Sequence, residues 1–188
     1  MNRRNFLALS GASVVALALG IGAYTHLKTA ESPLATDLKP FFNMSFKEAA
    51  QKADAGNLFA NLRAKGVIDE HGKINISVLD SLAKTDNAIP YQGLYYSQTE
   101  LELYSFAYLM HENKLVRLKE HDLLGGDYHS MKVKDADECF AACESSSQCT
   151  GFTYAEPTHP IEEKHNSCWL KDKPVKYNVS DHYISGTK

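Results

Sequence analysis

Asp135-Ala-Asp-Glu-Cys139-Phe-Ala-Ala-Cys143 is the first of three cysteine-bearing segments that decide the fold of this 188-residue chain. The second is Cys149-Thr-Gly-Phe-Thr-Tyr154, and the third is Cys168-Trp-Leu-Lys171. All four cysteines of the protein lie in these segments, within a stretch of 30 residues. Such clustering is typical of a small module held together by disulfides, because a module of this size has only a marginal apolar core.

The first segment predicts a helix that presents two thiols on one face. Asp135 is suited to cap the N-terminus of this helix, and Glu138 stands three residues later, as in a capping box. Cys139 and Cys143 are four residues apart, so both face whatever the helix packs on.

Two short strands are predicted after the helix, over residues 149–154 and 168–171. Alternation in the second strand places Cys168 on the side opposite to Trp169. Four cysteines allow three pairings, and their spacing alone does not choose among them. The spacing does not match the paired C-x2-C frame of a structural zinc site, so we expect disulfides and no metal ligands.

The order of these segments, followed by the closing Ile184-Ser-Gly186, resembles the PAN/apple domain, a family of binding modules. The resemblance covers residues 121–188. It is to the shorter, two-disulfide form, because no cysteine lies near Leu123 or Gly186 to form the bridge that ties the termini of longer members.

This resemblance implies a disulfide pairing, a fold and a class of ligand. The implied pairs are Cys139 with Cys168 and Cys143 with Cys149. The implied fold is one helix packed on a small antiparallel sheet. Members of the family bind proteins or carbohydrates, so either kind of ligand is expected here.

The N-terminus predicts export. Arg3 and Arg4 precede an apolar run over residues 6–24, and a positive start followed by an apolar segment is typical of an export signal. Arg3-Arg4-x-Phe6-Leu7 also resembles the twin-arginine translocation motif of bacteria. The run is long enough to span a bilayer, so either a cleaved signal peptide or an uncleaved inner-membrane anchor is expected, with the rest of the chain in the periplasm.

The sequence as a whole predicts an α+β fold in four stretches. An N-terminal signal or anchor helix precedes a small helical segment, which leads into the PAN/apple-like module. The stretches are a signal peptide or membrane anchor over 1–30, a linker over 31–40, a helical region over 41–120 and the module over 121–188.

The helical region is predicted from apolar residues at helical spacing and from turn residues between them. Five tyrosines in this region are expected to complete its core, the alternative being that they stack on sugars or form a protein interface: Tyr91, Tyr95, Tyr96, Tyr104 and Tyr108. The first expected helix begins at the capping box Ser45-Phe-Lys-Glu48, is divided at Gly56 and ends at Gly66. A second helix is expected over 77–83 and a loop over 90–96. A third helix is expected to begin at Ser97.

No catalytic residues, cofactor or metal are expected. Asp69, Glu70 and His71 are interpreted as a solvated turn, and the common nucleophile, metalloprotease and phosphate-loop motifs are absent from the sequence. Lys and Arg number 20 against 23 Asp and Glu, with no basic stripe, which argues against nucleic-acid binding.

The connection over residues 156–167 is the expected ligand site, because it joins two strands that disulfides should hold rigid. The alternative is a tolerated insertion without a binding role. The residues predicted to contact a ligand are Glu156, His159, Glu162, Glu163, Lys164 and His165.

Two functions are compatible with these features. The first is an exported, non-catalytic binding protein that recognises a protein or a carbohydrate through the PAN/apple-like module. The alternative is a non-catalytic accessory subunit of an exported redox enzyme, held in a membrane partner complex.

Overall fold

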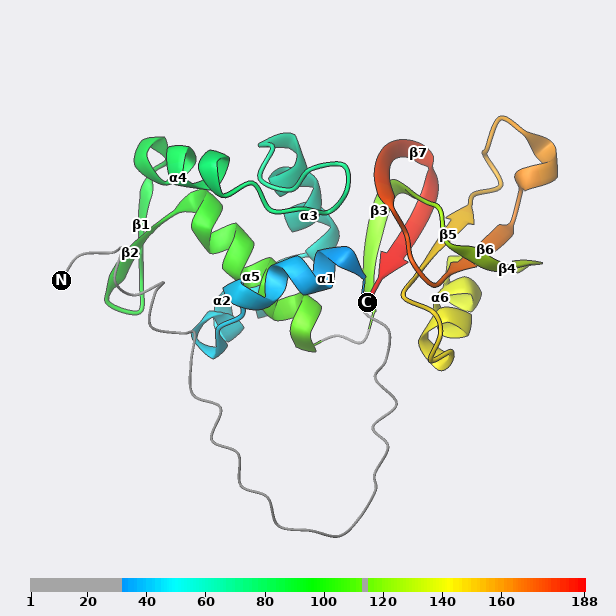
Figure 1. Ribbon diagram of the computed structural model, residues 1–188, viewed down its shortest axis with the longest axis horizontal. Helices are drawn as coiled ribbons and strands as arrows, with labels where there is room; N and C mark the ends of the chain where they lie inside the picture. The colour runs from blue at the N-terminus through cyan, green and yellow to red at the C-terminus, as the bar shows by residue number, and fades with distance from the viewer. Residues whose placement is uncertain (1–31, 113–114) are drawn as a thin grey trace, which may run out of the picture.

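The computed structural model describes residues 32–112 and 115–188, which form an α+β structure with most helices at one end and a five-stranded antiparallel sheet at the other (Figure 1). The export signal of Arg3, Arg4, Phe6 and Leu7, and with it the expected signal peptide or anchor helix, lies outside the described residues. In the part of the chain that is described, no helix is long and apolar enough to cross a membrane.

The helical region, by which we mean residues 32–112, is built around its longest helix, α5, which contacts the four helices before it. Its elements are α1 (Pro33–Leu38), η2 (Lys39–Phe41), η3 (Met44–Phe46), α2 (Lys47–Gln51), α3 (Ala55–Ala64), α4 (Ile76–Thr85), β1 (Ala88–Tyr91), β2 (Leu94–Ser97) and α5 (Gln98–Glu112).

Most of the stretch predicted as a linker, residues 31–40, is α1. The side chain of Ser32 caps the helix and Pro33 occupies its first turn, which is where proline is best tolerated. Leu34 and Leu38 lie four residues apart on one face, and both are buried in the core.

The helix predicted to begin at Ser45 is two helices, α2 and α3, and its capping box is not used. Asn43 caps the preceding 3-10 helix η3, since its side-chain oxygen accepts a hydrogen bond from the N–H of Ser45 at 2.9 Å, and α2 follows η3 without a side-chain cap. The break falls at Asp54 rather than Gly56, because the Asp54 carboxylate caps α3. Gly66 follows α3 with a φ of 73°, as predicted for a residue that ends a helix.

Residues 90–96, predicted as a loop, belong to the β1–β2 hairpin. The turn consists of Gln92 and Gly93, whose φ angles of 49° and 80° are those of a two-residue type I′ turn. The signal was present as a glycine between two tyrosine-rich segments, but glutamine is an unusual first residue for this turn.

Tyrosines of the hairpin and α5 pack around Phe46, which is buried. The ring centroid of Phe46 lies 5.4 Å from that of Tyr91, 5.2 Å from Tyr96 and 4.5 Å from Tyr104. Tyr95, by contrast, is 63% exposed. The expected role of the tyrosines in the core therefore applies to most of them but not to Tyr95.

The second half of the chain forms the sheet, with strand order β3-β7-β5-β6-β4, and one helix, α6, on one of its faces. The cysteines, Phe152 and Leu170 form the core between α6 and the sheet. The predicted helix and both predicted strands are confirmed. The elements are β3 (Val116–Leu124), β4 (Asp127–Lys132), α6 (Ala136–Ser145), β5 (Gly151–Ala155), η4 (Glu162–Lys164), β6 (Ser167–Lys171) and β7 (Lys176–Thr187).

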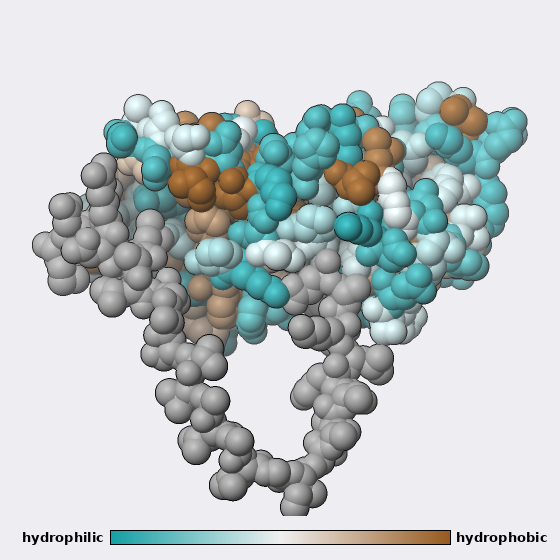
Figure 2. All heavy atoms as spheres, viewed as in Figure 1, coloured by the Kyte–Doolittle hydropathy of each residue, from teal (hydrophilic) through white to brown (hydrophobic). Residues whose placement is uncertain are grey.

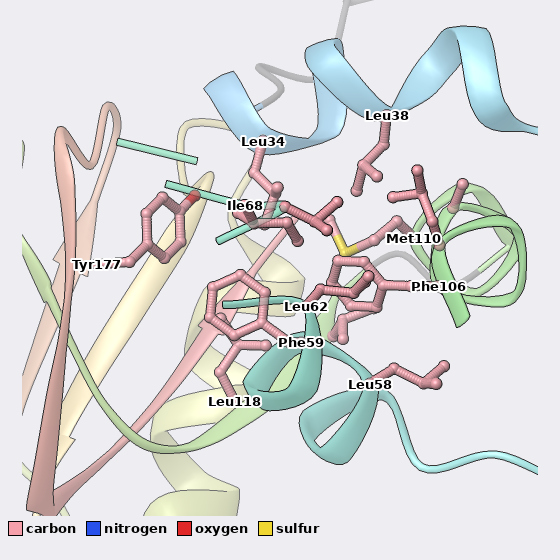
Figure 3. Packing of buried hydrophobic residues seen from close by; sticks show 14 of the residues in the cluster. Leu34, Leu38, Leu58, Phe59, Leu62, Ile68, Phe106, Met110, Leu118 and Tyr177 are labelled. Carbon is pink, nitrogen blue, oxygen red and sulfur yellow. The ribbon is translucent and has the colours of Figure 1, made fainter. Parts of the chain in front are cut away.

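A second core joins the helical region to the sheet (Figure 3). Phe59 and Leu62 of α3 pack with Leu118 of β3 and Tyr177 of β7. All four side chains are fully buried. The predicted boundary between residues 120 and 121 therefore falls inside β3, and the two predicted units share a core.

Strand β3 bends sharply at Glu120, where its register with β7 shifts and the φ angle is 57°. Beyond the bend, residues 121–124 of β3 pair with residues 176–179 of β7. We call these two paired segments the folded-over ribbon, because they lie on the sheet face opposite α6.

Hydroxyl groups of the sheet hold the folded-over ribbon in place. The N–H of Leu123 donates to Oγ1 of Thr153 at 3.0 Å, and Oγ of Ser185 donates to the carbonyl of His121 at 2.6 Å. Thr153 and Ser185 are buried and face each other on β5 and β7. Their burial is tolerated because each hydroxyl is hydrogen-bonded.

The turn over residues 69–72 fastens the helical region to the start of β7. The N–H of Tyr177 donates to the carbonyl of Glu70 at 2.7 Å, and the Glu70 carboxylate forms an ion pair with Lys176 at 2.8 Å. His71 makes a further hydrogen bond to a backbone carbonyl just before β7. The sequence interpretation of this segment as a turn is correct, but it overlooked that the turn contacts the sheet.

Candidate binding surface

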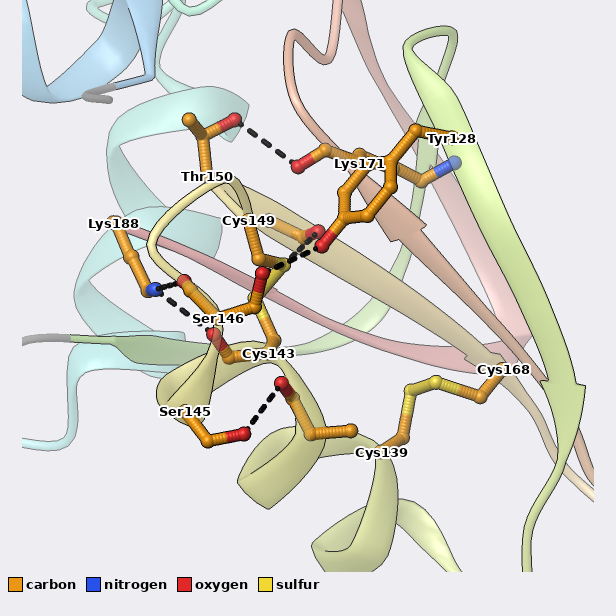
Figure 4. The surroundings of a disulfide bond; sticks show 12 residues. Tyr128, Cys139, Cys143, Ser145, Ser146, Cys149, Thr150, Cys168, Lys171 and Lys188 are labelled. Carbon is orange, nitrogen blue, oxygen red and sulfur yellow. Dashed lines mark hydrogen bonds between the residues drawn. A yellow bond between two sulfur atoms is a disulfide. The ribbon is translucent and has the colours of Figure 1, made fainter. Parts of the chain in front are cut away.

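Two disulfides fix α6 to the sheet (Figure 4). Cys139 is joined to Cys168 of β6, with Cα atoms 5.7 Å apart. Cys143 is joined to Cys149, just before β5, with Cα atoms 5.3 Å apart. These are the two pairs that the family resemblance implies. Both bridges are buried, so they support the surface that the strands carry and are not themselves part of it.

Both ends of α6 are hydrogen-bonded. At the N-terminus, the Asp135 carboxylate accepts a hydrogen bond from the N–H of Glu138 at 3.0 Å, which is the predicted cap. At the C-terminus, Nζ of Lys188 donates to the carbonyls of Cys143 and Ser146, both at 2.8 Å (Figure 4). A cation at this end also complements the helix dipole.

The connection between β5 and β6, which we call the β5–β6 loop (residues 156–166), is rooted on Asn166. Its φ of 57° is one that asparagine tolerates better than most residues. The N–H of Asn166 donates to the carbonyl of Ala155 at 3.0 Å, and its carbonyl accepts from Val133 at 2.9 Å. Its side-chain oxygen accepts from the hydroxyl of Tyr154 at 2.8 Å. The base of the loop is therefore closed.

His159 packs inward beneath the loop and is 7% exposed. Nδ1 accepts a hydrogen bond from the N–H of Ile161 at 3.0 Å, which leaves the ring proton on Nε2 to be donated to the hydroxyl of Tyr183 at 2.9 Å. His165 in turn donates from Nε2 to the carbonyl of His159 at 2.6 Å. Both histidines therefore brace the loop, with His159 buried and His165 partly exposed, and contact of either with a ligand stays a prediction.

The cations next to the loop are also used internally. Nζ of Lys132 donates to the carbonyls of Glu163 and His165 at 2.7 and 2.6 Å. Nζ of Lys164 lies 3.2 Å from the hydroxyl of Tyr183 and 5.9 Å from the centroid of its ring. Both ammonium groups therefore hold neutral acceptors in place.

The outer side of the loop is acidic with an apolar tip. Glu162 and Glu163 are exposed, and their carboxylates form no ion pair with the described part of the chain. Ile161 beside them is 47% exposed, and Glu156 at the start of the loop is half-buried. Figure 2 shows the corresponding end of the molecule as mostly hydrophilic, with a small hydrophobic spot at the top right.

The six predicted ligand residues thus divide into two groups. Glu156, Glu162 and Glu163 lie on the outer side, and His159, Lys164 and His165 act within the loop. Ile161 was missed by the sequence reasoning. Its position between a proline and two glutamates, in a segment already predicted to be exposed, was the available signal.

Trp169 extends the surface next to the loop onto the sheet. It lies on the face opposite Cys168, half-buried, between Thr153 of β5 and Ser130 of β4. Its ring centroid is 6.5 Å from that of Tyr183, in an edge-to-face arrangement. Alternation along β6 predicted the face on which Trp169 lies. The partial exposure of its indole ring could be seen only in the structure.

Charged groups lie on the same face as Trp169. The side chain of Lys171 is 3% exposed, and its ammonium group forms an ion pair with Asp127. Burial raises the pKa of Asp122, and the nearby Lys171 and a hydrogen bond from Thr153 partly oppose that rise. No group of three or more His, Cys, Asp or Glu side chains within residues 32–112 and 115–188 is placed to hold a metal ion.

A comparison with known protein families bears on this surface. Residues 121–171 match the PAN domain family. The match begins in β3 and ends with β6, so it contains α6, all four cysteines, the β5–β6 loop and Trp169. The helical region and β7 lie outside it.

A PAN domain indicates a module that binds proteins or carbohydrates. Together with two disulfides, it is consistent with an exported or extracellular protein, because disulfides persist in oxidising compartments. The segment that matches the PAN domain family is not separate from the rest of the chain, since β7 pairs with both β3 and β5 and β3 packs on α3. The helical region covers one end of the sheet and leaves the β5–β6 loop at the other (Figure 1).

Proposed function

We propose that this protein is an exported, non-catalytic binding protein, and that its PAN domain recognises a ligand through the outer side of the β5–β6 loop. The contact surface consists of Ile161, Glu162 and Glu163, with Trp169 and Glu156 beside them. The twin-arginine-like N-terminus supports a periplasmic location, with the apolar run over residues 6–24 acting as a signal peptide or an inner-membrane anchor.

The supporting observation is that some side chains of the loop stabilise its conformation while others are exposed to solvent. Every cationic or imidazole side chain that the loop could direct outward is hydrogen-bonded to the loop itself or to Tyr183. The backbone is therefore held in one conformation while an apolar side chain and two carboxylates remain exposed. A surface ordered in advance loses little conformational entropy when a ligand binds.

The test compares loss of this surface with the same chemical change elsewhere. Full-length protein is assayed on immobilised glycans and on proteins extracted from the cell envelope, with bound material quantified for each variant. The loop variant is Ile161→Ser/Glu162→Gln/Glu163→Gln, and the matched control is Ile76→Ser/Glu48→Gln/Glu144→Gln, which alters exposed side chains on α4, α2 and α6.

We expect a glycan or protein that wild type and the control variant retain and the loop variant loses at least tenfold. Equal retention of every ligand by all three proteins would place the binding surface elsewhere. A stable complex with an oxidoreductase that tolerates the loop change would favour the alternative of an accessory subunit.

A further inference from the structure

His121, the first β3 residue of the folded-over ribbon, is buried where the ribbon packs against the helical region. Its side chain is 3% exposed, and its ring lies edge-to-face against Phe59 of α3, with centroids 4.9 Å apart. Phe59 also packs on Tyr177 of the ribbon at 5.6 Å. A single aromatic cluster therefore joins α3 to both strands of the ribbon.

One hydrogen bond fixes the tautomer of the neutral His121 ring. Nδ1 lies 2.7 Å from the carbonyl of Lys119, so Nδ1 carries the proton and donates it. Nε2 is then a bare acceptor, and it has no hydrogen-bond partner among the described residues. A second proton on Nε2 would create a buried cation whose N–H also lacks an acceptor, which is unfavourable in a site of low polarity.

The charged groups around His121 also disfavour the cation. Arg63, one turn after Phe59 on α3, donates to the carbonyl of Tyr177 at 2.9 Å and places a positive charge near the ring. Glu120, next to His121 on β3, acts in the opposite sense but more weakly. Burial is the largest cause and lowers the pKa of His121, while the hydrogen bond from Nδ1 to the Lys119 carbonyl partly opposes that lowering.

Two acidic groups of the turn over residues 69–72 act on this contact through Arg63. Asp69 and Glu70 favour the charged guanidinium, and the Glu70 carboxylate also pairs with Lys176 of the ribbon. Tyr177, the remaining titratable group that faces the cluster, is buried and its pKa is raised by that burial, so it is neutral when His121 titrates.

We propose that His121 is an acid-sensitive latch, which holds α3 on the folded-over ribbon while the imidazole is neutral and loosens that contact when Nε2 takes a proton from solvent. The disulfide-bonded α6 lies on the other face of the sheet and makes no use of this contact. Acid should therefore loosen the helical region before it affects α6.

The direction of the effect follows from proton linkage. An unfolded or locally opened chain binds the proton near pH 6.5, whereas the closed form binds it only at a lower pH. The stabilisation from neutral His121 is therefore complete above about pH 6.5 and is lost as the pH falls below it. One proton changes the ratio of closed to open molecules by up to about tenfold per pH unit.

Hydrogen exchange of the oxidised full chain at pH 7.5 and 5.5, with each rate corrected for intrinsic exchange, tests the latch. We expect protection of α3 and the ribbon to fall by up to about tenfold at the lower pH, with α6 unchanged. His121→Asn, which preserves a donor toward Lys119, should remove the difference, and His129→Asn, at an exposed histidine of β4, should leave it intact.

A second measurement covers the case in which His121→Asn fails to fold. Histidine NMR signals of the wild-type chain should give His121 a titration midpoint below 6.5, and Arg63→Gln should move that midpoint upward by removing the facing cation. A wild-type midpoint at or above 6.5, or an equal fall in protection of α3 and α6, would overturn the latch.

Discussion

The two disulfides differ in the length of chain they close, so their removal should cost different amounts of stability. Cys139–Cys168 spans 29 residues and Cys143–Cys149 spans 6. On the loop-entropy model, these lengths correspond to about 3.6 and about 2.2 kcal/mol at 25 °C. The expected difference of about 1.4 kcal/mol equals a factor of about ten in the ratio of folded to unfolded protein.

Paired alanine variants make this comparison fair. All four cysteines are fully buried, so Cys139→Ala/Cys168→Ala and Cys143→Ala/Cys149→Ala each remove two buried sulfur atoms and leave similar voids. What differs between the variants is mainly the length of the loop released in the unfolded chain.

Urea unfolding at pH 7.5, monitored by the fluorescence of the one tryptophan, supplies the measurement. With a slope of about 2 kcal/mol per molar urea, the variant that lacks the longer bridge should unfold at about 0.7 M less urea than the other variant. Equal midpoints, or a larger loss on removing the shorter bridge, would refute the loop-length reasoning.

Three further predictions concern a cap, a turn and an ion pair. Asp135→Ala should lower the free energy of unfolding by about 1 kcal/mol, and Asp135→Asn by less, in the same urea assay. Gly126→Ala should lower the free energy of unfolding by more than about 2 kcal/mol, because its Cβ would lie 2.5 Å from a backbone oxygen. Gly93→Ala, which has a similar φ and open space around it, should lower the same free energy by only about 1–2 kcal/mol. The hydrogen bond from Lys176 lowers the pKa of Glu70, so this pair stabilises the fold above about pH 4.5 and that contribution is lost as the pH falls through the lowered value. Carboxyl NMR titration should show the pKa of Glu70 rise in Lys176→Gln; an unchanged value would contradict the assigned cause.

The local structure around the cysteines could be predicted because its signals are local. The Asp135 cap, the spacing of Cys139 and Cys143 and the alternation of β6 each depend on a few neighbouring residues. The pairing of the cysteines depends on distant segments, so spacing left it open and only the family resemblance selected one arrangement.

The structure departs from the sequence-based expectations where tertiary contacts decide the conformation. The stretch that contains Leu34 and Leu38 has the composition of a linker, yet both leucines fill the core beside β3 and β7. His159 was predicted to contact a ligand from its place in a polar loop, whereas the structure shows its ring hydrogen-bonded to Tyr183 on another strand. Neither contact can be read from the surrounding sequence, because the partner lies more than 20 residues away.

The most direct test of the proposed binding surface is a footprint of the bound ligand. Once a retained glycan or protein is identified, hydrogen exchange of the full chain is compared with and without it at saturation. The account predicts increased protection of the amides of residues 156–166 and of β6 beside Trp169, with the helical region unchanged. Protection confined to the helical region, or to the β1–β2 hairpin, would contradict it.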